Sequence, residues 1–163
     1  MPINSINQPE ILFVDEELRL VKCEGNYEFA LPWYQDETLV KMVDNKSEVY
    51  SMEQLKRMYS YLENVGELYF IEYHFNGAWI PVGDVTLGRN GDLPIVIAPE
   101  FQKIGIGRRV IQKLITRAKL LELEQAEVRI YKFNIASQNL FASLGFVRAG
   151  ETEKEFIYEL KLR

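Results

Sequence analysis

The chain has 163 residues, a formal net charge of −5 and a hydrophobic fraction of 47%, which are typical of a soluble globular domain with a sizeable core. Its single cysteine, Cys23, excludes an intramolecular disulfide, and one cysteine with one histidine, His74, cannot assemble a zinc site. Carboxylate metal sites are not excluded, but no pattern indicates one and we expect no bound metal. The N-terminal segment lacks the features of a secretory signal, and no apolar run reaches membrane-spanning length. We therefore expect one domain over residues 1–163, in a cytoplasmic protein that does not bind membranes.

The charge is unevenly distributed. Residues 1–63 contain twelve acidic and six basic residues, whereas residues 101–119 contain six basic residues and no acidic one. An acidic body favours cationic partners and a local basic segment favours an anion, although a solvated helix face also explains such a run. The basic segment is too short for a nucleic-acid track, so we expect no nucleic-acid partner.

The first third of the chain alternates short strands with helical pieces. Residues 11–24 predict two short strands around an acidic turn, with Leu18 and Leu20 facing inward. Residues 27–45 look helical in pieces, because Pro32 interrupts the pattern.

A firmer helix follows over residues 51–65. Ser51 can cap it and Gln54 is the matching capping-box residue, while Gly66 is suited to end it. One face of this helix is apolar and consists of Met52, Leu55, Met58, Tyr59 and Leu62.

From residue 67 the hydrophobic period changes to two. Residues 67–75, 78–87 and 92–99 predict three strands, separated by Asn76-Gly77 and Asn90-Gly91. Because Asn-Gly is a strong hairpin signal, we expect an antiparallel meander from 67 to 97. The run at 94–98 is apolar on both faces, which predicts a buried central strand.

The remaining elements complete a layered fold. An amphipathic helix after residue 105, a strand at 126–131, a helix at 134–145 and a final strand pair follow in turn. This order predicts an α/β (α+β) fold, with helices flanking a mixed, mostly antiparallel central sheet. The buried face of the first of these helices is expected to contain Val110, Ile111, Leu114, Ile115, Ala118 and Leu121.

The glycine-containing loop at residues 102–107 stands between a strand and a helix. A helix N-terminus offers unpaired N–H groups and a partial positive charge, and glycine allows close approach to the backbone. The loop is therefore suited to phosphate, with Lys103, Arg108 or Arg109 adding charge. A Walker A ending is absent, and Val110 stands where a dinucleotide fingerprint needs its third glycine. A tight turn without a ligand is the alternative.

Two motifs resemble those of the GNAT superfamily of N-acetyltransferases. Gln102, Gly105 and Gly107 match its Gln/Arg-x-x-Gly-x-Gly/Ala signature, and residues 134–146 match its later Asn-x-x-Ala/Ser segment ending in Gly-Phe. The motifs stand in the order and at the separation that are usual in the family. Residues 18–20 and 31–33 also look like the branch that holds aminoglycoside and ribosomal-protein N-terminal acetyltransferases.

The resemblance implies that acetyl coenzyme A is the co-substrate. Its pyrophosphate would lie on the glycine loop. Its pantetheine arm would lie between two splayed central strands at 94–98 and 127–131 and hydrogen-bond to the backbone of residues 95–97. Asn134 has a second interpretation as the N-cap of its helix, and both can hold. The residues expected to contact the co-substrate are Ile95, Val96, Ile97, Gln102, Lys103, Ile104, Gly105, Ile106, Gly107, Arg108, Asn134, Ser137 and Phe141.

The family mechanism suggests where the catalytic groups lie. The backbone N–H near Ile97 would polarise the thioester carbonyl. Asp84 interrupts an apolar strand, and by alternation it shares a face with Ile80, Val82 and Thr86. We expect Asp84 to act as the base or to bind the acceptor, while a solvent-facing strand residue is the simpler alternative.

The other proton-transfer groups are less clearly indicated. Glu72 and His74 are weaker candidates for the base. The family often has a tyrosine that protonates the departing thiolate where this chain has Phe141, which cannot donate a proton. Tyr131 on the neighbouring strand, or water, could supply that proton.

The sequence therefore predicts an N-acetyltransferase that moves acetyl from acetyl-CoA to a primary amine of a small molecule or peptide by direct attack. Because of Phe141, the alternative is a weakly active or non-catalytic acyl-CoA-binding module. The state of assembly is expected to be a monomer or homodimer. The acceptor would enter beside the helical N-terminal segment, whose aromatic and acidic residues suit a polyamine, an aminoglycoside or a peptide amine: Trp33, Tyr34, Asp36, Glu37, Asp44 and Glu48.

Overall fold

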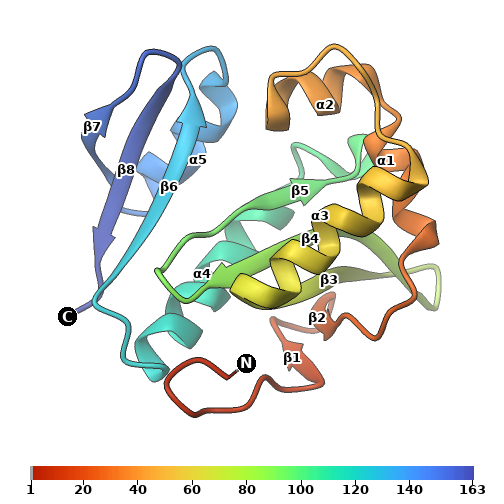
Figure 1. The fold of residues 1–163 in the computed structure, drawn as a ribbon. Helices are drawn as coiled ribbons and strands as arrows, with labels where there is room; N and C mark the ends of the chain where they lie inside the picture. The colour runs from red at the N-terminus through yellow and green to blue at the C-terminus, as the bar shows by residue number, and fades with distance from the viewer. Residues whose placement is uncertain (1) are drawn as a thin grey trace.

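Two antiparallel sheets form the frame of the molecule, which a computed structural model describes over residues 2–163 (Figure 1). The larger sheet has the order β1-β2-β3-β4-β5 and the smaller one the order β6-β8-β7. The strands are β1 (Ile11–Phe13), β2 (Leu18–Lys22), β3 (Gly66–Phe75), β4 (Ala78–Gly88), β5 (Ile95–Ile97), β6 (Gln125–Tyr131), β7 (Val147–Glu151) and β8 (Glu155–Lys161).

Helices cover both faces of the larger sheet, with α3 on one side and α4 on the other (Figure 1). The α/β (α+β) class predicted from the sequence is confirmed. The helices are η1 (Glu28–Ala30), α1 (Leu31–Tyr34), α2 (Glu37–Asp44), α3 (Met52–Val65), η2 (Pro99–Phe101), α4 (Ile106–Leu120) and α5 (Ile135–Ser143).

Local sequence signals set several boundaries. Ser51 and Gln54 form the predicted capping box of α3, and Gly66 is its C-cap. Asn76 and Gly77 have φ values of 51° and 78°, as a tight β3–β4 hairpin requires. At the second Asn-Gly pair only Gly91 adopts positive φ, and β5 begins four residues later.

The sheet divides the apolar interior into two clusters. One packs the inner face of α4 against the sheet and includes Leu18, Leu20 and the predicted stripe from Val110 to Leu121. The other packs α1, α2 and α3 against the opposite face and includes Trp33, Tyr34 and Tyr59. The helices before the meander and the helix α4 after it are therefore held on opposite sides of β3 and β4.

The two sheets touch at one point and then separate. Glu127 N donates to Gly91 O at 3.0 Å, and a parallel bridge joins Asp92 to Glu127. Beyond this point β5 pairs only with β4, and β6 pairs only with β8. A Cβ on Gly91 would lie 2.0 Å from Gln125 O, so glycine permits the close approach at the apex. The predicted splay of the central strands is confirmed.

The expectation that residues 94–98 form a strand buried on both faces is wrong. The strand β5 covers three residues, of which Val96 is buried while Ile95 and Ile97 are partly exposed. Because β6 diverges, the far edge of β5 has no strand partner and its outer side is open.

The predicted face of Asp84 is also partly wrong. The register of β3 and β4 shifts by one residue, so that Ile71 pairs with Gly83 and Glu72 pairs with Pro81. This bulge puts Val82 in the cluster on the α4 side, whereas Asp84 contacts tyrosines of the opposite cluster. An extra residue reverses the alternation, which strict counting along the strand cannot detect.

Candidate active site

Asp84 is the most unusual polar residue in the interior. Its side chain lies in β4 and is only 3% exposed. Tyr34 Oη donates a hydrogen bond to its Oδ2 at 2.6 Å, and Tyr59 Oη donates to the same oxygen at 2.8 Å. The solvent-facing alternative for this residue is therefore wrong.

Burial raises the pKa of Asp84 to about 6, although the hydrogen bonds from the two tyrosines favour the charged form. A carboxylate with such a pKa is mostly ionised at neutral pH and still accepts a proton readily. The same burial, together with the nearby charge of Asp84, raises the pKa of Tyr34, so this tyrosine stays a neutral donor.

A cavity of about 310 Å³ leads from Asp84 to the separated strands. Oδ1 of Asp84 has no hydrogen-bond donor among residues 2–163, and it is not an enclosed atom, so it is accessible from this cavity. The walls come from α2, α3, β5, β6 and α5. They include Tyr34, Met42, Asp44, Tyr50, Met58, Tyr61, Ile95, Val96, Ile130, Tyr131, Asn134, Ser137 and Phe141.

The open edge of β5 presents backbone groups to the gap between the sheets. Ala98 N donates to Val82 O of β4 at 2.7 Å, and Val96 is paired with Asp84 of the same strand. Because backbone groups two residues apart point the same way in a strand, the N–H and C=O of Val96 also point toward β4. By alternation, the polar groups of Ile95 and Ile97 point to the open edge. The expectation that the backbone of Val96 is available to a ligand is wrong, because these groups are used within the sheet.

Gln102 ties the following loop to this edge. Its Nε2 donates to Ile97 O at 2.9 Å, so this carbonyl group of the open edge is occupied. The N–H of Ile97 takes no part in this hydrogen bond. The side chain of Gln102 thus holds the loop against β5, and its contact with the co-substrate stays a prediction.

The start of α4 has the geometry of an anion cradle. Lys103 and Gly105 have φ values of 65° and 88°, and Gly105 is the N-cap of the helix. A Cβ on Gly105 would meet no atom within 4 Å, so the loop faces open space there. The N–H groups of Ile106, Gly107 and Arg108 belong to the first turn and have no intrahelical acceptor. These residues fit a diphosphate group.

The basic side chains near the loop have different partners. Arg109 is bound to Asp15 at 2.7 Å and to Glu17 at 3.1 Å, which anchors α4 to the β1–β2 turn. The suggestion that Arg109 adds charge for phosphate is therefore wrong. Arg108 donates to Ser143 Oγ in α5, and Lys103 and Ile104 are exposed beside the loop.

The helix α5 forms the far wall of the cavity. Asn134 is its N-cap, with Oδ1 accepting from Ser137 N at 3.2 Å, and both residues also line the cavity. The N-cap interpretation of Asn134 is confirmed, and its contact with the co-substrate stays a prediction. Phe141 is 2% exposed, packs edge-on against Phe146 and reaches the cavity wall.

Tyr131 lies on β6 at the open end of the gap. Its ring stacks on Phe133 with centroids 5.5 Å apart, and it lines the same cavity as Asp84. Burial, and then the charges of Glu155 and Asp44, raise its pKa, so its phenol is protonated at neutral pH.

The weaker candidates for the base lie elsewhere. Glu72 pairs with Arg19 at 2.6 Å, and His74 packs on Trp79 with ring centroids 4.9 Å apart. Neither residue lines the cavity. Tyr50 and Tyr59 were not predicted to belong to the site. The pattern of α3 indicated only a core position for Tyr59, because this residue fits the apolar stripe.

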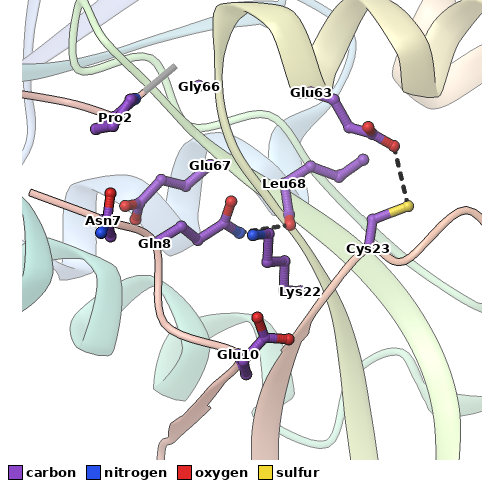
Figure 2. Close-up of a pocket in the computed structure, with 10 residues that line it drawn as sticks. All are labelled: Pro2, Asn7, Gln8, Glu10, Lys22, Cys23, Glu63, Gly66, Glu67 and Leu68. Atoms are coloured by element: carbon purple, nitrogen blue, oxygen red, sulfur yellow. Dashed lines mark hydrogen bonds between the residues drawn. The ribbon is translucent and has the colours of Figure 1, made fainter.

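Figure 2 shows a second cavity, of about 510 Å³, beside the N-terminal segment and the beginning of β3. Two of its acidic groups are engaged: Glu63 accepts from Cys23 Sγ at 3.1 Å, and Glu67 is paired with Arg117 at 2.8 Å. Burial raises the pKa of Cys23 to about 12, so the thiol is protonated and a poor nucleophile. This cavity has no group suited to catalysis comparable with Asp84.

Residues 2–163 contain no cluster of three or more His, Cys, Asp or Glu side chains placed to hold a metal ion. Each helix in this range is too short or too polar to cross a bilayer.

The sequence model described as the Acetyltransferase (GNAT) family matches residues 27–146, which is well over half of the chain. The chain belongs to this acetyltransferase family. Acetyl transfer is therefore its general activity, and acetyl-CoA is its co-substrate. No curated protein sequence matches this acetyltransferase.

Solved structures of low sequence identity share the fold of the acetyltransferase. A domain from Methanocaldococcus jannaschii is 22% identical with a TM-score of 0.78, covering 90% of this chain and 99% of that one. The spermidine N-acetyltransferase from Vibrio cholerae, solved with CoA and spermine, is 18% identical with a TM-score of 0.70 and covers 89% and 94%. The Salmonella typhimurium enzyme that modifies the N-terminal serine of ribosomal protein L7/L12 is 16% identical with a TM-score of 0.69 and covers 93% and 99%.

Proposed function

We propose that this acetyltransferase acetylates a primary amine by direct attack on acetyl-CoA, with Asp84 as the general base. The observation that carries the proposal is the buried carboxylate of Asp84, whose free Oδ1 opens into the cavity that reaches the unpaired edge of β5. Tyr34 and Tyr59 fix this carboxylate from the other side, so that its position does not depend on a ligand.

Each proton and bond has a place in this scheme. The ammonium form of the acceptor gives a proton to Asp84, and the free nitrogen lone pair then forms a bond to the thioester carbonyl carbon. The carbon–sulfur bond breaks and the attacking nitrogen releases its second proton to water, which leaves a neutral acetylated amine and the thiolate of coenzyme A. The thiolate takes a proton from Tyr131 or from water.

The backbone positions the donor. The N–H of Ile97 points to the open edge of β5, where it is placed to stabilise the negative charge that develops on the carbonyl oxygen. The first-turn amides of α4 and the open space over Gly105 suit the pyrophosphate. Ser137 and Asn134 line the cavity and are placed to contact the rest of the co-substrate.

Phe141 is consistent with turnover if another group supplies the last proton. Its side chain has no donor, but Tyr131 stands on the same cavity and is protonated at neutral pH. A thiol resembling cysteine has a pKa of about 8.5, so its thiolate is also a tolerable leaving group without an acid.

The acceptor is a small-molecule or peptidyl amine. The two structurally similar enzymes described above act on spermidine and on a protein N-terminus, and both therefore use amines. Among residues 2–163 the cavity contains two acidic side chains, Asp44 and Asp84, and these favour a cationic acceptor.

The test replaces Gly105 with tryptophan, which would fill the space over the loop. Gly105→Trp is expected to weaken acetyl-CoA binding in calorimetry by roughly tenfold or more. Gly25→Trp is the matched control, because Gly25 has nearly the same φ, 90°, and equally open surroundings away from the cavity. Equal affinity of the two variants would contradict the assigned loop.

Thiol release with a panel of amines tests catalysis itself. Amine-dependent release of coenzyme A well above acetyl-CoA hydrolysis is expected for the wild type. Binding of acetyl-CoA without such turnover would support a non-catalytic binding module instead.

A further inference from the structure

A second carboxylate opens onto the cavity that contains Asp84. Asp44 is the last residue of α2 and lines the cavity, where Tyr50 Oη donates a hydrogen bond to its Oδ2. The ion pairs of residues 2–163 do not include Asp44. Its negative charge therefore has no fixed counter-ion within the described chain.

The position of Asp44 on α2 is electrostatically unfavourable. The C-terminal end of a helix carries a partial negative charge from its last carbonyl groups, and an acidic residue there adds to it. Lys41 is the basic residue of this turn, but its Nζ donates to Asn45 Oδ1. A bound cation would be attracted both by the carboxylate and by the helix end.

Two tyrosines connect Asp44 with Asp84. The rings of Tyr34 and Tyr50 lie with centroids 5.0 Å apart, and their hydroxyl groups donate to different carboxylates, Tyr34 to Asp84 and Tyr50 to Asp44. Aromatic faces of this kind accept methylene groups and ammonium ions. Lys46 Nζ already lies 5.8 Å from the ring centroid of Tyr50, so this ring attracts a cation in the free protein.

The remaining charges near the cavity do not suit an anionic acceptor. Arg129 is the one basic residue among the described residues that line it. Its side chain is half exposed and lies 3.6 Å from Glu127. An acceptor bearing a carboxylate would therefore face Asp44 and Asp84 within the cavity, where the described lining provides no cation other than Arg129.

From this arrangement we infer that the acceptor is a linear diamine or polyamine with two ammonium groups. Asp84 receives the amine that is acetylated, and Asp44 with the end of α2 binds the ammonium that is not. The Tyr34 and Tyr50 rings line the path of the carbon chain between them. The assignment of the acetylated amine to Asp84 rests on the proposed function. The site for the second ammonium rests on Asp44 and the end of α2.

The experiment compares α,ω-diamines, from ethylenediamine to hexamethylenediamine, with n-alkylamines of the same chain length. We expect wild-type kcat/KM to favour diamines and to pass through an optimum in chain length. Asp44→Asn should lower kcat/KM for the best diamine by roughly 10- to 100-fold through KM, as for the loss of one charge-assisted contact, and leave n-alkylamines nearly unchanged.

Glu53→Gln is the matched control. It removes one negative charge from the exposed first turn of α3, outside the cavity, and should change kcat/KM for neither class of amine. Equal kcat/KM for diamines and n-alkylamines in the wild type would overturn the inference, as would equal effects of Asp44→Asn and Glu53→Gln.

Direct binding separates this inference from the proposed function. Calorimetric titration of the best-binding diamine into the protein needs no acetyl-CoA and should show an affinity that depends on Asp44. Such binding without turnover of any amine would contradict the proposed function and support the second cation site. If Asp44→Asn does not fold, the wild type still decides, because the preference for diamines must shrink as salt screens the second charge.

Discussion

Asp84→Asn is expected to stabilise the protein at neutral pH while it removes activity. The pKa of Asp84 is 3.8 in an exposed reference state and about 6 when it is buried here. Two pKa units at about 1.4 kcal/mol each correspond to ~3 kcal/mol by which ionised Asp84 destabilises the fold above pH 6. Asparagine keeps an oxygen that accepts the hydrogen bonds from Tyr34 and Tyr59, and it carries no charge to desolvate.

The sign of this effect follows from proton binding. Between pH 3.8 and about 6 the folded protein holds the Asp84 proton more tightly than the unfolded chain does, so the contribution of this residue to stability falls as pH rises. Below this window Asp84 is neutral in both states and the penalty disappears. The advantage of the variant should therefore grow with pH and level off above about pH 6.

Urea unfolding of both proteins between pH 5 and pH 8 measures the difference. The free energy of unfolding of Asp84→Asn, relative to the wild type, should rise by roughly 1–2 kcal/mol over this range, about half of the full effect. The variant should also lose kcat by roughly 100- to 10,000-fold, as for a missing general base. A difference in stability that does not change with pH, or a wild type that is more stable at pH 8, would refute the assigned burial cost.

Further substitutions test the leaving-group acid and the apex of the splayed strands. Phe141→Tyr is expected to raise kcat, because it adds a phenol to the cavity wall, and Tyr131→Phe is expected to lower kcat. Steady-state rates at saturating acetyl-CoA measure both effects. Unchanged rates would show that protonation of the thiolate does not limit turnover. Gly91→Ala is expected to lower the free energy of unfolding by roughly 2–4 kcal/mol, since its Cβ would lie 2.0 Å from Gln125 O at a φ of 86°. Denaturant unfolding measures this loss, and a change like that of Gly77→Ala, where φ is 78° and no atom lies within 4 Å, would argue against a close contact at the apex.

Local signals in the sequence were sufficient for most elements. The capping box of Ser51 and Gln54, the hairpin at Asn76-Gly77 and the apolar face of α4 depend on residues a few positions apart, so their patterns can be seen in the chain itself. The glycine loop before α4 is of the same kind, because a left-handed backbone at Gly105 is a property of that one residue.

The surroundings of Asp84 were decided by long-range contacts. One inserted residue in β4 reverses the strand alternation, and the two phenols that hold the carboxylate come from positions 50 and 25 residues away. Sequence patterns give the chemistry of Asp84, but its burial, and with it the raised pKa, exists only once α1 and α3 pack on the sheet.

By itself, the sequence determined the order of the elements, the loop suited to diphosphate and the family to which the chain belongs. Only the tertiary structure decided which groups share the cavity: it pairs Arg109 with Asp15 away from the loop, turns the backbone of Val96 into the sheet and brings Asp44 into the cavity of Asp84. The physical reason is that hydrogen bonding along a strand and helix capping are local, whereas desolvation and charge pairing depend on segments that meet only in the folded chain.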